Sequence, residues 1–328
     1  MTQAAGRPKV LSVVGPGRSG TTVLASILGE VDGVVTAGEV RWLWRRGVIE
    51  ERPCGCGRPP AGCPVWSRVL ADVIGAGPYR LDDEVVPAVL EMVRAQQEVS
   101  ERRHRLRVIR SASGGDAGWP ALRRVRAVTA HLCASLAATT GSSVIVDTSK
   151  RAQDAAVLAA VGSIDHYVLH VVRDPRAVAW SWRRAKPLRT ADGPQTMATR
   201  RLVPSVVRWM ENCIGAELLR RRVPRDRWLF MRYEDFAADP RGAVDAVLAF
   251  VGVDGAGTAF SGADTVVLGT NHTVAGNPNR FRTGPVRIVS DDEWRREMSL
   301  RDRRTVEAVA MPLLSRYGYP VLSRRASE

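Results

Sequence analysis

A short glycine-rich segment, GPGRSGTT at residues 15–22, has the composition of an anion-binding loop. Its glycines let the backbone turn tightly and approach a ligand without Cβ clashes. Arg18 adds a positive charge, and the two threonines that end the segment add hydroxyl groups. The sequence therefore predicts a site for a phosphate-like group here. The residues that we expect to bind it are Gly17, Arg18, Ser19, Gly20, Thr21 and Thr22.

The loop lies between an apolar run and an amphipathic segment. Val10–Val14 has the length and β-branched content of a strand buried on both faces, as at the centre of a parallel sheet. The segment that follows the loop has the pattern of a helix. We expect Ser19 or Thr21 to cap this helix, so that unpaired N–H groups and the positive end of its dipole converge on the anion.

The loop differs from the Walker A pattern G-x-x-x-x-G-K-[ST]. Gly15 and Gly20 match the two glycines, but Thr21 stands where the lysine belongs. The Walker lysine and Mg²⁺ together neutralise a triphosphate, whereas here the cation, Arg18, comes earlier in the loop. This difference predicts less negative charge at the transferring group and no obligatory metal. A Mg²⁺-dependent P-loop kinase remains an alternative.

A second candidate phosphate site follows the apolar run His166–Val172. Arg173 begins the sequence RDPR, and Ser181 lies eight positions further on, two turns into the next predicted helix. Arginine donates bidentate hydrogen bonds to a phosphate, and a hydroxyl on the facing helix can bind the same group from another side. The pair suits a separate phosphate, such as a 3′-phosphate.

Together these motifs resemble those of a known family. RSGTT at Arg18–Thr22 resembles the 5′-phosphosulfate loop of sulfotransferases that use 3′-phosphoadenosine 5′-phosphosulfate (PAPS), and Arg173 with Ser181 resembles their 3′-phosphate motif. The resemblance implies transfer of a sulfuryl group to a hydroxyl or phenol of a small molecule, lipid or glycan. PAPS would be the cofactor and 3′-phosphoadenosine 5′-phosphate (PAP) the product, without a catalytic metal.

Two later segments resemble the same family. Met231–Val253 is similar to the strand end and helix beside adenine, which implies that Tyr233 stacks on the base. Gly276–Arg282 (GNPNRFR) resembles the late basic loop that closes over the nucleotide, with Arg282 as a binding residue.

The general base is predicted from a further resemblance. Gly38-Glu39-Val40-Arg41 is similar to the G-E-x-x-R context of protein-tyrosine sulfotransferases, although arginine comes one position earlier. This implies that Glu39 accepts the acceptor proton, and shielding by Trp42 and Trp44 would raise its pKa. Alternatively, Glu39 forms a structural ion pair with a nearby arginine. Asp147 and His272 are the reserve candidates.

Two cations are candidates to stabilise the bridging oxygen as the S–O bond breaks. Lys150 follows the apolar run Ser143–Val146, and Arg18 lies in the loop itself. Both would act on charge that develops in the transition state. Lys150 is also compatible with an exposed position at the start of a helix.

Repeated strand, loop and helix patterns predict the fold. The apolar runs Ser143–Val146, His166–Val172 and Trp228–Arg232 each lead into polar residues and then into a helical pattern. We expect an α/β fold, with a P-loop-like parallel sheet flanked by helices, in a single domain over residues 1–328. A helical, cysteine-containing insertion at about residues 50–140 would cover the acceptor side, with helices over Asp82–Arg105 and Pro120–Thr139. Lys186–Thr199 is expected to form a lid.

Three of the five cysteines, Cys54, Cys56 and Cys63, lie close together in CGCGRPPAGC. Reduced thiols, a disulfide between two of them, and a zinc site with a distant fourth ligand such as His104 or Cys133 all remain open.

The formal charge of +14 also permits a different class of function, nucleic-acid binding. However, the basic residues are nearly all dispersed arginines, with no run of five or more, no zinc-finger spacing and no aromatic RNA-binding signature. Nucleic-acid binding is therefore disfavoured. No stretch approaches about 18 apolar residues, and the N-terminus leads directly into the first core strand. We expect no membrane span and a cytoplasmic location.

Overall fold

The structure is a computed structural model. It describes residues 6–75, 84–115, 118–184, 187–190, 193–196, 199–255 and 260–321, with the backbone alone for 187–190 and 193–196.

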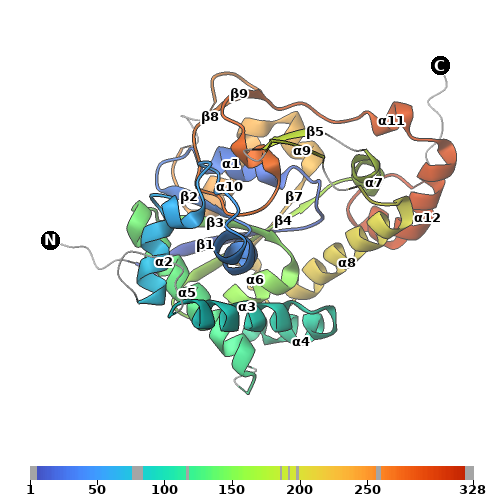
Figure 1. Cartoon of the computed structure of the whole chain (residues 1–328). Coiled ribbons are helices and arrows are strands. Elements are labelled where there is room, and N and C mark those ends of the chain that lie inside the picture. Colours follow the sequence, from blue (N-terminus) through green and yellow to red (C-terminus); the bar gives the residue numbers. More distant parts are fainter. Residues whose placement is uncertain are drawn as a thin grey trace.

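A five-stranded parallel sheet forms the centre of the molecule (Figure 1), which confirms the predicted α/β fold. Because all five strands are parallel, their carboxyl ends lie at one edge, where open α/β sheets bind ligands. In spatial order the strands are β2 (Val34–Gly38), β3 (Val144–Lys150), β1 (Lys9–Val14), β4 (Asp165–Val172) and β7 (Trp228–Arg232).

Helices cover both faces of the sheet (Figure 1). Successive side chains of β1 show the two layers, since Val10 and Val14 pack on one side and Leu11 and Val13 on the other. The first side carries the helical insertion, with α2 (Trp66–Ile74), α3 (Val86–Ser100), α4 (Arg105–Arg110), α5 (Pro120–Thr140) and also α6 (Ala152–Ala159). The second side carries α1 (Thr21–Leu28), α9 (Tyr233–Ala238) and α10 (Pro240–Val251).

A third group of helices packs beside β4. Arg176 near the start of α7 is only 2 % exposed and pairs with Asp174 and Glu307, both at 2.6 Å. This buried network joins α7 to α12 and shows that Asp174 has a structural role. The group comprises α7 (Pro175–Arg183), α8 (Leu202–Arg220), α11 (Trp294–Glu297) and α12 (Leu300–Arg316).

The structure differs from the predicted elements in several places. β3 continues four residues beyond the predicted end at Val146, to Lys150. The helix predicted over Asp82–Arg105 is divided into α3, a 3-10 turn and the start of α4, and its residues 82 and 83 lie outside the described residues. The late loop includes β9 (Gly284–Arg287), which pairs with β8 (Thr265–Leu268).

The segment predicted as a lid, Lys186–Thr199, is described in part. The backbones of β5 (Pro187–Thr190) and β6 (Gly193–Thr196) form an antiparallel hairpin that the sequence did not predict. Residues 186, 191–192 and 197–198 lie outside the described residues. Among the helices that the structure describes, none combines the length and apolar character needed to cross a membrane.

Candidate active site

A cavity of about 310 Å³ lies at the carboxyl edge of the sheet. It receives residues from the ends of β1, β3, β4 and β7 and from the late loop, so segments far apart in the sequence meet there. We call it the nucleotide cavity. The predicted residues that line it are Arg18, Gly20, Thr21, Thr22, Lys150, Arg173, Ser181, Tyr233 and Arg282.

The glycine-rich loop depends on the absence of side chains at two points. A Cβ at Gly15 would lie 2.0 Å from the carbonyl oxygen of Val171, and one at Gly20 would lie 2.7 Å from the ring of Tyr233. Both glycines have positive φ angles, as does Arg18 at 72°. A non-glycine residue in this conformation is strained, and such strain is concentrated at binding sites.

The start of α1 differs from the prediction. Gly20 occupies the N-cap position in the left-handed conformation, and neither Ser19 nor Thr21 caps the helix through its side chain. The prediction of a side-chain cap was therefore wrong. The consequence favours ligand binding, because the first N–H groups of α1 keep no side-chain acceptor and point toward the cavity. Ser19 is buried in the loop, and a Cβ at Gly17 would lie 3.3 Å from the ring of Trp182.

Arg173 connects the loop with the far wall of the nucleotide cavity. Its Nη1 donates to the backbone oxygen of Arg18 at 3.0 Å, and its Nη2 donates to the backbone oxygen of Asp291 at 2.9 Å. The guanidinium lies 4.3 Å from the ring centroid of Tyr233. Arg173 is thus held by backbone oxygens and an aromatic ring, with one carboxylate, that of Asp291, at 3.3 Å. Arg173 itself also lines the cavity.

Arg18 is a half-buried cation. Burial and the nearby Arg200 lower its pKa to about 10, and its guanidinium stacks on Trp182 at 4.5 Å. The group is therefore still protonated at neutral pH. An anion in the cavity would be bound by a charge that is already partly removed from water, which strengthens the interaction.

A second cavity of about 170 Å³, the acceptor cavity, adjoins the loop on the other side. Lys150 lines both cavities. It has a φ of 70°, and its Nζ donates to Oε1 of Glu39 at 2.5 Å. Lys150 is therefore a strand-end residue between the two cavities rather than an exposed residue at a helix start. The other lining residues include Gly17, Glu39, Arg41, Trp182, Arg200, Arg208 and Asn212.

The electrostatic environment of Glu39 differs from the prediction. Burial raises the pKa of its carboxyl, but Lys150, Arg41 and Arg46 outweigh burial and hold that pKa below its ordinary value. The predicted rise was therefore wrong for this structure. The largest cause of this lowering is the ion pair with Lys150. Trp42 adds to it, because its ring stacks on Arg41 and Arg46 at 4.2 and 4.0 Å and so holds these cations nearby instead of shielding the carboxylate.

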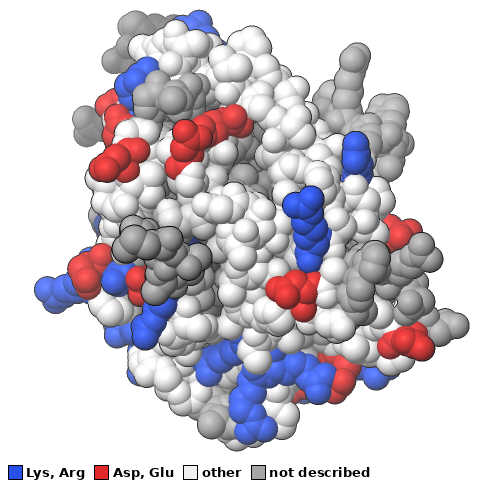
Figure 2. Space-filling model, turned by 90° about the vertical axis from the view of Figure 1, so that its left-hand side faces the viewer, with Lys and Arg blue, Asp and Glu red and all other residues white. Residues whose placement is uncertain are grey.

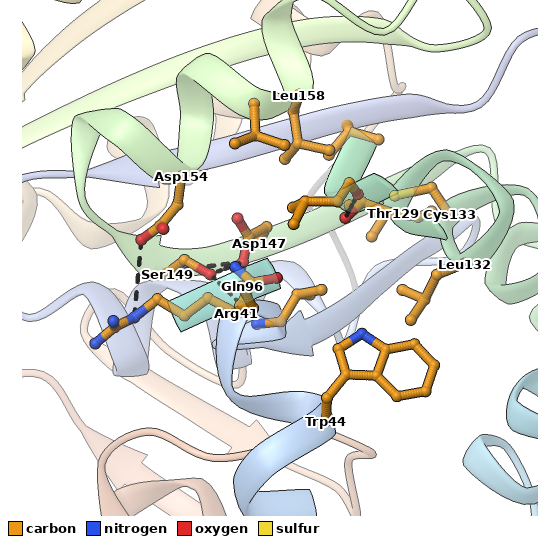
Figure 3. A pocket seen from close by; sticks show the side chains of 15 residues that line it. Arg41, Trp44, Gln96, Thr129, Leu132, Cys133, Asp147, Ser149, Asp154 and Leu158 are labelled. Atoms are coloured by element: carbon orange, nitrogen blue, oxygen red, sulfur yellow. Dashed lines mark hydrogen bonds and ion pairs between the residues drawn. The ribbon is translucent and has the colours of Figure 1, made fainter. Parts of the chain in front are cut away.

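Asp147, one reserve base, lies in a different place. Its side chain lines a small cavity of about 30 Å³ between the sheet and the helical insertion, together with Trp44 and Asp154 (Figure 3). Its Oδ1 accepts hydrogen bonds from the N–H and the hydroxyl of Ser149 at 3.1 and 2.6 Å. Burial raises its pKa to about 7. Asp147 is thus a buried structural carboxyl outside both larger cavities.

His272, the other reserve base, faces the cysteine cluster. Its Nδ1 lies 3.2 Å from Sγ of Cys63. The two distant ligands considered for that cluster do not reach it, because His104 packs against Trp119 and Cys133 lines the small cavity beside Asp147.

Several lining residues were not predicted. Asn277 and Asn279 come from the loop that was recognised only through Arg282, and Asp291 follows it. Trp182 and Arg200 flank the acceptor cavity. A signal existed for the asparagines in GNPN, since turn residues beside a predicted binding loop are natural ligand contacts. No local pattern marked the other three.

The fold is α/β, and the predicted phosphate loop and the predicted second anion site line one cavity at the carboxyl edge of its sheet. A family model described as "Sulfotransferase family" matches residues 11–256. The chain therefore belongs to the sulfotransferase family, as its motifs predicted.

Comparison with solved structures confirms the fold. The sulfotransferase domain from the Synechococcus PCC 7002 olefin synthase is 18% identical, with a TM-score of 0.54, 98% of this chain covered and 99% of that domain. The sulfotransferase domain from the curacin biosynthetic pathway is 13% identical, with a TM-score of 0.54 and coverage of 97% and 100%. A search of curated proteins gave no match.

Proposed function

We propose that this protein transfers the sulfuryl group of PAPS to a hydroxyl or phenol of a small molecule, lipid or glycan. The observation that carries the proposal is that one cavity joins the Arg18–Thr22 loop to Arg173 and Ser181. These two anion sites come from different strand ends and match a ligand with two separate phosphate positions. The volume of about 310 Å³ lies at the lower end of the range of small-molecule sites.

The lining residues fit PAPS in one orientation. The loop and the start of α1 would bind the 5′-phosphosulfate, and Arg173 with Ser181 would bind the 3′-phosphate. Tyr233 would stack on the adenine, and Arg282 would approach from the late loop. The donors are mainly arginine and lysine, and the acidic residue in the lining, Asp291, already pairs with Arg173 and Arg184. This set suits direct phosphate binding better than Mg²⁺, which prefers carboxylates and water.

We propose that Glu39 and Lys150 act as a pair in transfer. As the acceptor oxygen forms its bond to sulfur, its proton passes to Glu39. The S–O bond to the phosphate breaks, and its electron pair remains on the phosphate oxygen, where Lys150 or Arg18 stabilises the charge. Lys150 must turn from Glu39 toward the nucleotide cavity to do this. That movement also removes the cation that most lowers the pKa of Glu39 and makes it a stronger base.

The acceptor cavity supports a small acceptor with an apolar body and a polar or anionic group. Trp182 and Val178 supply apolar surface, whereas Arg200 and Arg208 supply positive charge. The acceptor hydroxyl would enter between Gly17 and Glu39.

The test is release of PAP from PAPS by the purified protein, with a panel of phenol, lipid and glycan acceptors and EDTA in every reaction. We expect acceptor-dependent turnover that EDTA leaves unchanged, strongest with small acceptors that carry an acidic group. Turnover of ATP that requires Mg²⁺, without turnover of PAPS, would support the kinase alternative instead.

The alternative function, nucleic-acid binding, predicts a continuous basic surface. On the face in Figure 2, acidic residues and uncharged surface separate most of the basic groups, which gather only toward the lower edge. Such a surface offers no continuous track for a phosphate backbone on this face. Duplex affinity with a steep salt slope, unchanged in Arg18→Ala, would contradict this conclusion.

A further inference from the structure

Four potential metal ligands meet outside both larger cavities. Cys54, Cys56, Cys63 and His272 place their ligand atoms within 4.8 Å of one another. Three of them lie within ten residues, whereas His272 comes from the other end of the chain, 209 positions from Cys63. The fold therefore brings a fourth potential ligand, His272, to the three cysteines that lie close together in the sequence.

The three cysteines are free thiols in the structure, and the separation of Cys54 and Cys63 fits a tetrahedral site. Sγ of Cys54 and Sγ of Cys63 are 3.7 Å apart, far beyond the disulfide bond length of about 2.05 Å. Tetrahedral zinc, with Zn–S near 2.3 Å and Zn–N near 2.0 Å, places its sulfur ligands about 3.8 Å apart and sulfur and nitrogen about 3.5 Å apart. The observed separation of 3.2 Å between Cys63 Sγ and His272 Nδ1 needs only a small adjustment.

The backbone around the cysteines supports thiolate ligands. The N–H of Cys56 points to the sulfur of Cys54, and the N–H groups of Val65 and Trp66 point to the sulfur of Cys63. Such donors stabilise negative charge on sulfur. The turn is closed by hydrogen bonds from Cys54 N to Arg58 O at 2.7 Å and from Gly57 N to Cys54 O at 2.8 Å.

The histidine is held in place by its own backbone. Trp66, which is fully buried, donates from Nε1 to the backbone oxygen of His272 at 2.5 Å. Gly55 N donates to Thr273 O at 2.9 Å on the other side. The histidine ring therefore enters the cysteine loop from a fixed backbone, as the orientation of a metal ligand requires.

We propose that Cys54, Cys56, Cys63 and His272 bind a structural zinc ion. All four positions are filled by protein atoms, which is typical of structural rather than catalytic zinc. The site is separate from the proposed sulfuryl transfer, in which no metal takes part.

The proposed zinc site lies where it can position residues of the proposed active site. The chain passes from His272 through Val274, whose oxygen accepts from Glu39 N at 2.9 Å and whose N–H donates to Ala37 O at 3.0 Å. A few residues later the same segment supplies Asn277 and Arg282 to the nucleotide cavity. Zinc would thus fix the late loop to the insertion and hold Glu39 in place.

The test is the metal content of the full-length protein, purified without added metal or chelator and measured by mass spectrometry. We expect an equimolar amount of zinc, retained on dialysis. Co²⁺ exchanged into the site should give the visible absorption of tetrahedral thiolate coordination. Cys56→Ser should lose both signals, because it removes one of the four ligands at a half-buried position. Cys133→Ser, at a buried cysteine elsewhere, should keep them.

Three results would overturn the proposal. These are wild-type protein without zinc, a mass that shows an intact disulfide between two of the three cysteines, and zinc that Cys56→Ser retains in full. The wild-type measurement does not depend on whether a variant folds. It also does not depend on PAPS turnover, so it fails or succeeds separately from the proposed function.

Discussion

The nucleotide cavity and the acceptor cavity are built in different ways. Arg173 and Tyr233 directly follow β4 and β7, and Arg18 lies in the loop that follows β1, so one local strand, loop and helix unit places each of them. Glu39 and Lys150, by contrast, form a pair 111 positions apart, and the late loop holds Glu39 through Val274. In the first cavity each of these residues is placed by its own strand, loop and helix unit, whereas in the second the state of Glu39 is set by its contact with a distant strand end.

The difference has an electrostatic consequence. In the nucleotide cavity Arg18 stacks on Trp182, and Arg173 contacts the backbone oxygen of Arg18 and the ring of Tyr233 and also pairs with Asp291. In the acceptor cavity the cation Lys150 is already paired with Glu39. We therefore expect the pair of Lys150 with Glu39 to rearrange when the cofactor enters.

The largest effect is expected from Glu39→Gln, which removes the proposed base and keeps its shape. The value of kcat should fall about 10²–10⁴-fold, as for other general bases, while the affinity for PAP changes little. Steady-state kinetics and calorimetry measure the two quantities. Glu50→Gln, which alters a carboxylate paired with Arg45 and Arg52, is the matched control. Full activity of Glu39→Gln would show that another group accepts the proton.

The electrostatic environment of Glu39 also predicts how kcat/KM depends on pH. Because Lys150, Arg41 and Arg46 outweigh burial and hold the pKa of Glu39 below 4.5, Glu39 is already ionised in the free enzyme at neutral pH. The acid limb of kcat/KM from this group should therefore lie below that value, and kcat/KM should not fall because of Glu39 between pH 8 and pH 5. A limb near pH 6 would contradict the pairing with Lys150.

A smaller effect is expected at Tyr233 in the nucleotide cavity. Removing the ring in Tyr233→Ala should weaken PAP binding about tenfold, the usual value of one stacked base. Tyr233→Phe should bind PAP almost as tightly as wild type, because the hydroxyl contacts backbone groups of Val289 and Asp291. Equal losses in both variants would show that the hydroxyl, rather than the ring, binds the nucleotide.

The smallest effect on activity is expected at Asp147. Because burial raises its pKa to about 7, the folded state binds a proton that the unfolded state releases near 3.8. The free energy of unfolding should therefore decrease, by a few kcal/mol at most, as the pH rises from about 4 to about 7. Asp147→Asn should remove this decrease and keep activity. Denaturant unfolding at several pH values measures the first effect, and release of PAP from PAPS measures the second. If the free energy of unfolding of Asp147→Asn still decreases with pH as in wild type, a group other than Asp147 causes the decrease.

The sequence predicted the nucleotide cavity far better than the acceptor cavity, and the reason is physical. Arg18 and Arg173 were found because a buried strand that ends in a polar turn is visible within a short window. The ion pair of Glu39 with Lys150 was missed because nothing near Glu39 indicates which distant strand end will face it. For the same reason His272 was considered as a base and not as a partner of Cys63.

The central claim is that Arg173 binds a 3′-phosphate, and one titration tests this claim most directly. PAP and AMP, which differ in that phosphate, are titrated in EDTA into wild type, Arg173→Ala and the control Arg183→Ala, whose arginine lies on α7 and pairs with Asp302. Losing a charge-assisted contact should weaken PAP binding about 10–100-fold in Arg173→Ala and leave AMP and the control unchanged. An equal loss for PAP and AMP, or tight binding of ATP with Mg²⁺ without binding of PAP, would contradict the account.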